Sequence, residues 1–265
     1  TGTVDNLSLI TSSIMSKKLA AGSDAILLDV KCGSGAFMKT EQDARRLAEL
    51  MVKIGSAAGK ETVAVITDMD QPLGRAVGNA LEVREAIQVL KNEGPDDITE
   101  LSVKLAGTMV YLGGRASSLQ EGEQKAAQAL SDGSALQKFR EFVAAQGGDP
   151  DITEDPGLLP SAEISEDLKA WCDGYIAGMD TMRIGLASQH TGAGRETKDD
   201  EIDLSAGLYL HRKTGEYVRK GDVICTVYGN DVKKVGKALE EVGNSVKIRN
   251  DKPEPQKLIK AVITV

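Results

Sequence analysis

A hydroxyl and an ammonium are spaced so that one helix would present both on the same side. Ser13 and Lys17 stand four residues apart in the segment 4–20, and residues four apart share a helical face. A hydroxyl can donate and accept hydrogen bonds, and an ammonium donates three. The pair therefore predicts a surface that can grip a small ring rich in acceptor atoms.

The elements that must position this pair follow directly in the chain. A stripe of apolar residues predicts an amphipathic helix over 4–20, and its members are Val4, Leu7, Ile10, Ile14 and Leu19. The apolar run 25–30 is typical of a strand buried on both faces. It leads into the glycine-rich loop Lys31–Ala36, which is either a phosphate cradle or a plain tight turn.

The pattern of strands and helices predicts the fold class. A helix over 40–59, a strand over 62–67 and a helix over 78–92 continue the alternation, which favours an α/β fold with a mostly parallel mixed sheet and flanking helices. Three more helical stretches follow, and 147–160 is a linker rich in Gly, Pro and Asp. Short strands around two helices then predict an α+β, sandwich-like C-terminal appendage.

Composition excludes several classes of partner. The 265 residues carry 32 Lys and Arg against 40 Asp and Glu, a net charge of -8, whereas nonspecific nucleic-acid binding needs a basic surface. No apolar run approaches the roughly 20 residues of a membrane span. Cys32, Cys172 and Cys225 form neither a CxxC pair nor a Cys/His cluster. We therefore expect reduced thiols in a cytoplasmic protein without nucleic-acid or membrane partners.

Three other segments leave alternatives open. In 68–85 a proline and two glycines interrupt the start of a helix, so free carbonyls and Glu85 could bind a monovalent cation, or the segment is a plain helix-entry loop. The acidic segment 191–203 is either a lid or interface loop or a solvated one. His190 and His211 stand beside no nucleophile motif, which favours structural roles.

Taken together, the motifs resemble one enzyme family. The matching stretches are residues 1–40, the segment DMDQPLGRAVGNALEVREAIQVLKNEGPDD at 68–97, and GAGRETKDDEID at 192–203 with the later VRKGD turn. They resemble the pyrimidine-nucleoside phosphorylases, the family that includes thymidine phosphorylase. The QPLG and GNALEV sequences are more similar to those of the broad-specificity enzyme, and a thymidine-restricted phosphorylase is the alternative.

The resemblance implies a pentosyltransferase of nucleotide salvage. Such an enzyme uses phosphate to convert uridine, deoxyuridine or thymidine into the free base and a (deoxy)ribose 1-phosphate, with no organic cofactor. Lys17 is implied as the catalytic residue, because it can donate to a ring carbonyl and stabilise the departing base anion. The implied base pocket consists of Ser13, Lys17, Ile10, Ile14 and Phe37. A potassium ion is implied at the carbonyls of Leu73 and Ala76 and at Glu85, and a homodimer is expected.

The resemblance also implies how the domains are arranged along the chain. Residues 1–21 would be the last helix of a small α domain, 22–160 the central α/β domain and 161–265 the C-terminal α+β domain. The family's phosphate-binding lysine–serine loop and a base-pocket arginine would precede Thr1, so we expect no phosphate-binding residue here. We therefore predict that these 265 residues alone are inactive. Cys32 stands where the family pattern has threonine or valine.

Two readings from other classes compete with this one. The VRKGD turn near Gly221 is similar to turns of lipoyl- and biotinyl-type carrier modules, but the lysine motif for attachment is lacking there. A phosphoribosyltransferase would need a diphosphate and magnesium site, and no acidic pair is placed for one.

Overall fold

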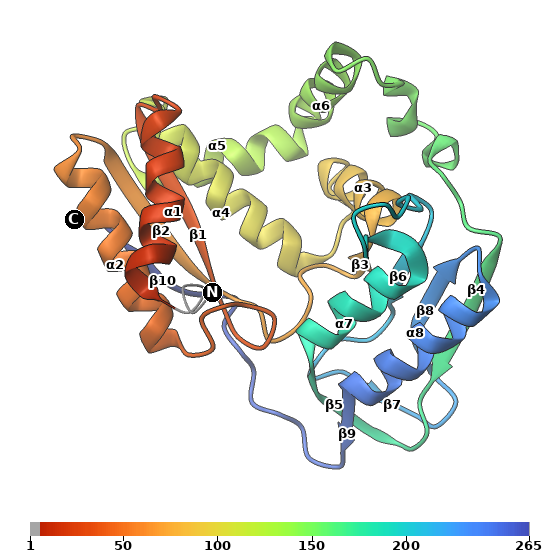
Figure 1. The fold of residues 1–265 in the computed structure, drawn as a ribbon. Helices are drawn as coiled ribbons and strands as arrows, with labels where there is room; N and C mark the ends of the chain where they lie inside the picture. The colour runs from red at the N-terminus through yellow and green to blue at the C-terminus, as the bar shows by residue number, and fades with distance from the viewer. Residues whose placement is uncertain (1–5, 265) are drawn as a thin grey trace. The chain divides into compact units, whose positions relative to one another are not determined.

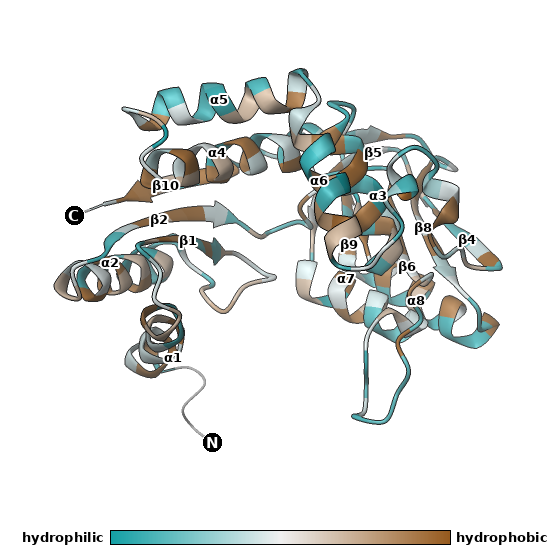
Figure 2. Cartoon of the chain, turned by 90° about the horizontal axis from the view of Figure 1, so that it is seen from above, coloured by the Kyte–Doolittle hydropathy of each residue, from teal (hydrophilic) through white to brown (hydrophobic). Residues whose placement is uncertain are grey.

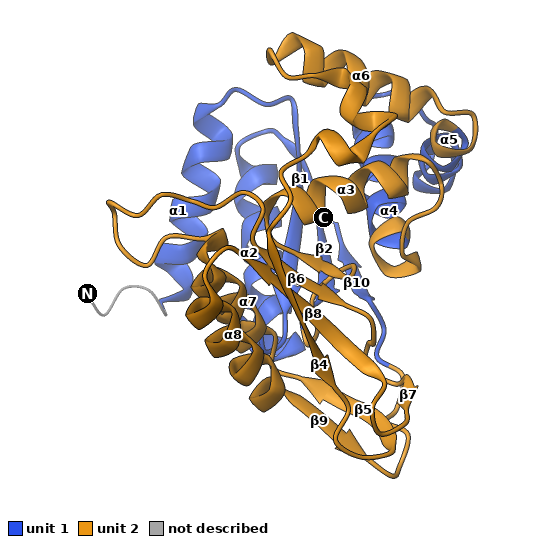
Figure 3. Cartoon of the chain, turned by 90° about the vertical axis from the view of Figure 1, so that its right-hand side faces the viewer, with its two compact units in different colours: residues 1–69, 100–128, 256–265 blue, residues 70–99, 129–255 orange. Residues whose placement is uncertain are grey.

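The computed structural model describes residues 6–264, which form two compact units (Figure 3). The first unit comprises the described residues up to 69, residues 100–128 and those from 256 onward; the second comprises 70–99 and 129–255. The units are interleaved along the chain. The boundaries expected after residues 21 and 160 stay predictions.

The sheet of the first unit has three strands, in the order β1-β2-β10 (Figure 1). Strands β1 (Ala25–Cys32) and β2 (Glu61–Asp68) pair in parallel, and β10 (Ile259–Ile263) pairs antiparallel with β2. Within residues 6–264 this is the one parallel ladder, so the sheet is mixed rather than mostly parallel. Strand β10 comes from the segment that the sequence places with the C-terminal domain, because strand pairing brings it back beside β2.

Helices cover both faces of this sheet (Figures 2 and 3). Helix α2 (Glu41–Ala57) packs on β1, β2 and α1, and its start is the predicted cap, because the Thr40 side chain accepts a hydrogen bond from the Asp43 N–H at 3.2 Å. On the other face lie α4 (Asp96–Leu112) and α5 (Leu119–Ser131). The largest apolar residues of the core between the sheet and α2 are Met15, Ile26, Leu28, Leu47, Met51 and Ile66.

Helix α1 runs over Leu7–Ala20 and begins at Asn6, whose side chain accepts from the Leu9 N–H. The most buried residues of α1 are Thr11 and Met15. The sequence instead predicts an apolar stripe, of which Leu7, Ile10, Ile14 and Leu19 pack only at the edge of the core, and Val4 lies outside the described residues. The polar Thr11 tolerates burial because its hydroxyl donates to the Leu7 carbonyl at 2.7 Å.

Helices α4 and α5 cross at two glycines. A Cβ added at Gly122 would lie 2.1 Å from the carbonyl oxygen of Gly107, and one added at Gly107 would lie 2.5 Å from the Glu123 backbone. The ion pair of Lys104 with Glu123, at 2.5 Å, spans the same crossing. The absence of side chains at both positions therefore permits this close approach.

We expect Gly122→Ala to destabilise the protein by about 1–3 kcal/mol, the usual cost of overpacking, because the new methyl group must push the two helices apart. The measurement is urea unfolding followed by circular dichroism. Gly236→Ala is the matched control, because Gly236 is helical and a Cβ there meets nothing within 4 Å; it should be neutral or stabilising by up to about 1 kcal/mol. Equal unfolding curves for the two variants would contradict the close crossing.

The second unit contains two antiparallel sheets. One has the order β3-β6-β8-β4 and the other β7-β5-β9. Their strands are β3 (Ala76–Val77), β4 (Ile164–Lys169), β5 (Gly174–Met179), β6 (Gly207–Leu210), β7 (Tyr217–Val218), β8 (Val223–Gly229) and β9 (Val246–Arg249). Helices α7 (Thr181–Ser188) and α8 (Val232–Ser245) pack together over a core centred on Ile176, Ile184, Leu208 and Ile224. The α+β character predicted for this segment is confirmed.

The other helices of the second unit are α3 (Asn79–Leu90) and α6 (Ser134–Ala145). The predicted linker contains two short 3-10 helices, η1 (Pro150–Thr153) and η2 (Pro156–Leu158). The Arg84 guanidinium of α3 donates to three carbonyls of this segment at 3.1–3.3 Å. The linker is therefore an ordered part of the unit.

Few other features bear on function. Over residues 6–264 no helix has the length and apolar character needed to cross a bilayer.

The two histidines contact neighbouring elements of the second unit. His190 Nδ1 lies 2.7 Å from Glu241 Oε2, and His211 Nε2 lies 2.8 Å from Thr226 Oγ1. His190 belongs to the π-helical turn η3 (Gln189–Ala193), which continues α7. Both imidazoles thus hold elements of the second unit together.

Candidate functional site

Helix α1 presents the predicted base-binding pair to solvent. Ser13 and Lys17 are both exposed, and they lie on the face opposite Thr11 and Met15, because positions two residues apart in a helix differ by about 200°. The Lys17 ammonium makes no hydrogen bond or ion pair with any of residues 6–264. The burial of Met15 holds the helix while leaving an unpaired ammonium and a hydroxyl one turn apart for a ligand.

The other predicted base contacts differ in their exposure. Ile10 and Ile14 are half-buried on α1. Phe37 lies on the loop after β1, in the same unit, and its side chain is 75% exposed. An aromatic ring of that exposure has apolar area to gain from contact with a flat base. The structure places all five predicted base-site residues in the first unit.

The glycine-rich loop after β1 is folded on itself. The N–H of Gly33 donates to the Met38 carbonyl, that of Gly35 to the Met69 carbonyl, and that of Ala36 back to Gly33, at 3.0–3.1 Å. Lys39 Nζ also donates to the Ser34 carbonyl at 2.8 Å. Three N–H groups of this loop are therefore engaged within the protein, as they are in a tight turn.

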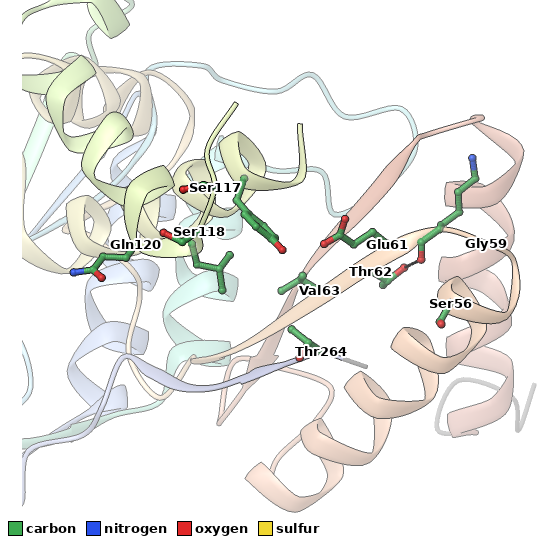
Figure 4. Close-up of a pocket in the computed structure, with 12 residues that line it drawn as sticks. Ser56, Gly59, Glu61, Thr62, Val63, Ser117, Ser118, Gln120 and Thr264 are labelled. Carbon is green, nitrogen blue, oxygen red and sulfur yellow. Dashed lines mark hydrogen bonds between the residues drawn. The ribbon is translucent and has the colours of Figure 1, made fainter. Parts of the chain in front are cut away.

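A large pocket of the first unit lies elsewhere. It has a volume of about 810 Å³ and is formed by the start of β2 and by the connection from α4 to α5 (Figure 4). Glu61, Thr62 and Val63 line it on the side of β2, and Ser117, Ser118 and Gln120 line it on the helical side. Ligands of parallel α/β sheets bind at the carboxyl ends of the strands, whereas this pocket lies at the amino end of β2. We therefore do not assign it to the predicted substrate.

In the second unit, Glu85 is the centre of the predicted cation site. The side chain is 3% exposed, and its Oε1 accepts hydrogen bonds from the N–H groups of Arg75 and Ala76 at 2.7 and 3.1 Å. Burial raises the pKa of Glu85, and the two backbone donors oppose that shift. A buried carboxylate is stabilised by a cation, and no described hydrogen bond reaches its Oε2.

The edge strand β3 directs the backbone groups of Ala76 away from its sheet. Leu210 N–H donates to the Arg75 carbonyl at 2.7 Å, so Ala76 and Tyr209 form a non-hydrogen-bonded pair of the antiparallel ladder. Both backbone groups of Ala76 therefore point away from β6, and its N–H donates to Glu85. The Ala76 carbonyl lies on that same edge.

Because Gly74 has no side chain, the Glu85 carboxylate can lie against its backbone. The Gly74 φ of +68° is in the left-handed region, and a Cβ there would lie 2.0 Å from Glu85 Oε2. Glycine is therefore required both by the backbone conformation and by the carboxylate. Backbone carbonyls and a carboxylate are ligands that hard cations prefer, so the buried Glu85 carboxylate and the Ala76 carbonyl are of the kind that could hold a potassium ion.

A buried lysine ammonium lies beside this loop, and no pattern in the sequence indicates it. Lys213 is 8% exposed, and its ammonium donates to the carbonyls of Pro72 and Gly74 and to Asp97 Oδ2, the last two at 2.6 and 3.0 Å. Burial lowers the pKa of Lys213, and Asp97 opposes the shift. These partners lie more than 100 residues away in the chain, so no local pattern could reveal them.

Other long-range bonds join the same two segments. The Arg75 guanidinium donates to the His211 carbonyl at 2.7 Å and pairs with Glu216 at 3.1 Å. The Thr214 N–H donates to the Gln71 side chain at 3.1 Å. Among residues 6–264 no group of three or more His, Cys, Asp and Glu side chains could hold a metal, so a cation here would depend on carbonyls fixed by these bonds.

Comparison with known families agrees with this arrangement. Residues 1–136 match the family model described as "Glycosyl transferase family, a/b domain", and residues 175–249 match "Pyrimidine nucleoside phosphorylase C-terminal domain". The first match includes α1 with Ser13 and Lys17 and the loop with Glu85. The second includes Lys213 and most of the antiparallel sheets.

Individual relatives are identical to this chain at about half of the aligned positions. The chain is 51% identical to a pyrimidine-nucleoside phosphorylase of Staphylococcus epidermidis and 48% identical to one of Bacillus subtilis, in each case over the whole chain and 60% of the relative. It is 53% identical to the enzyme of that name from Geobacillus stearothermophilus, over 87% of the chain and 53% of the relative. The chain thus spans between 53% and 60% of the length of these relatives. On these matches it belongs to the glycosyl transferase family with this a/b domain, and within it to the pyrimidine-nucleoside phosphorylase family.

Proposed function

We propose that the full-length protein is a pyrimidine-nucleoside phosphorylase. It would transfer the pentose of uridine, deoxyuridine or thymidine to inorganic phosphate: a phosphate oxygen forms a bond to C1′ of the sugar, and the bond from C1′ to the base nitrogen breaks with its electron pair leaving on the base. The observation that carries this proposal is the identity of about 50% to enzymes of that name over the whole chain.

The exposed face of α1 supports specific roles for Lys17 and Ser13. As the base departs, negative charge develops on its ring carbonyl, and a donated hydrogen bond from the Lys17 ammonium stabilises that charge more than the neutral substrate. Ser13, one turn away, can donate to or accept from the amide edge of the ring. Ile10, Ile14 and Phe37 would contact the apolar faces of the base.

The buried carboxylate of Glu85 supports a potassium ion at the carbonyls of Leu73 and Ala76. When bound, this ion would supply positive charge that keeps the Glu85 carboxylate ionised and orders the loop from 70 to 78. No protein group of this chain is proposed to bind phosphate. The homodimer, the cytoplasmic location and the inactivity of these 265 residues alone belong to the same proposal.

The test of the proposed function is a phosphate-dependent assay on the full-length protein. We expect release of uracil from uridine and of thymine from thymidine, each with one equivalent of pentose 1-phosphate, and no release without phosphate. The ratio of the two rates distinguishes the broad-specificity enzyme from the thymidine-restricted one. Full-length, folded protein that releases neither base would contradict the proposal, and intact mass without a lipoyl or biotinyl increment would exclude the carrier alternative.

A further inference from the structure

We propose that Lys213 is a positioning residue for the cation site, because its ammonium fixes the loop whose other carbonyls would bind the ion. This inference rests on the proposed potassium site. It concerns a residue that belongs to the C-terminal part of the chain, whereas Leu73, Ala76 and Glu85 belong to the part before residue 100.

The first step is the coordination of the ammonium. An ammonium has three N–H donors, and Lys213 finds three acceptors: the carbonyls of Pro72 and Gly74 and a carboxylate oxygen of Asp97. With a residue exposure of 8%, every donor is used within the protein. Charge-assisted bonds of this kind are stronger than neutral ones, so they hold the loop firmly.

The second step concerns which loop carbonyls bind Lys213 and which remain for an ion. Lys213 binds those of Pro72 and Gly74, and it therefore leaves those of Leu73 and Ala76 for an ion. Asp97 Oδ2 also accepts from the Gly74 N–H at 3.1 Å, so Gly74 is held through both its N–H and its C=O. Because Gly74 lies against Glu85 Oε2, its position decides where that oxygen points.

The third step concerns charge. The loop gathers two buried or half-buried carboxylates, Glu85 and Asp97, and Lys213 neutralises only one of them by direct contact, at 3.0 Å from Asp97. Arg75 is committed to Glu216 and to the carbonyls of β6 and the turn after it. One further monovalent cation would balance Glu85, which is the charge that potassium supplies.

The experiment measures potassium binding by thermal unfolding of the full-length protein, titrated with KCl against choline chloride at constant ionic strength. We expect Lys213→Met to raise the half-saturating KCl concentration at least about tenfold, the lower range for loss of an outer partner of a metal site. Methionine fills similar space without donors. Lys237→Met, an exposed lysine on α8, is the control and should match the wild type. Asp97→Asn should shift the value in the same direction by less.

The outcomes separate the inference from the proposed function. If Lys213→Met and Asp97→Asn lower the melting temperature equally at every KCl concentration and leave half-saturation unchanged, Lys213 is only structural and the inference is overturned. A wild type without a potassium-specific shift would also overturn it, while base release in the phosphate assay tests the phosphorylase function independently. If Lys213→Met does not fold, the Asp97→Asn titration decides.

Discussion

Lys17→Ala in the full-length protein should lower kcat/KM for uridine phosphorolysis by about 10²-fold, the typical loss when one donor to a developing negative charge is removed. The ammonium is exposed on α1 and makes no bond with any described residue, so its removal disturbs no contact of the fold. The loss should fall mainly on kcat, because the donor contributes most once the base carries charge.

The matched control is Lys18→Ala. Lys18 is the next residue, equally exposed and in the same last turn of α1, so it removes the same charge from the same helix end. Lys18 lies about 100° around the helix from Lys17, so it is not on the face of Ser13, and we expect near-normal kinetics. Equal losses for both variants would indicate a general electrostatic effect, and an unimpaired Lys17→Ala would remove Lys17 from the site.

Glu85→Gln should abolish most of the response to potassium. Glutamine keeps a carbonyl oxygen for the N–H groups of Arg75 and Ala76, and so it conserves the fold of the loop. It replaces the charged oxygen beside Gly74 by an amide that cannot neutralise a cation. The half-saturating KCl concentration in thermal unfolding should therefore rise by at least about tenfold.

The control for this change is Glu93→Gln, which removes the same charge from an exposed side chain just beyond α3. It should leave the potassium titration unchanged. Wild-type half-saturation in Glu85→Gln would mean that the buried carboxylate is not a ligand. A higher melting temperature without added salt is also expected for Glu85→Gln, because burial disfavours the ionised glutamate.

Local sequence patterns were sufficient to predict many of the helices and strands of this protein. The spacing of Ser13 and Lys17 placed both on one face of a helix, and the structure confirms a helix there with both side chains exposed. Strand β1 is not buried on both faces as predicted, because its buried residues alternate with partly exposed ones. The positions of β1 and β2, the burial of β2, the cap of α2 at Thr40 and the α+β character after residue 160 were also predicted correctly. All of these depend on residues within a few positions of one another, where the helical and strand periods act.

Only the tertiary structure decided which face of α1 is buried and which groups complete the cation loop. Thr11 and Met15 are the buried residues because α2 and the sheet happen to face them, and β10 joins β2 from nearly 200 residues away. Lys213, Asp97 and Gly74 meet through hydrogen bonds that span up to 139 positions. Such contacts leave no period in the sequence, because each residue alone is an ordinary turn lysine, helix-start aspartate or loop glycine.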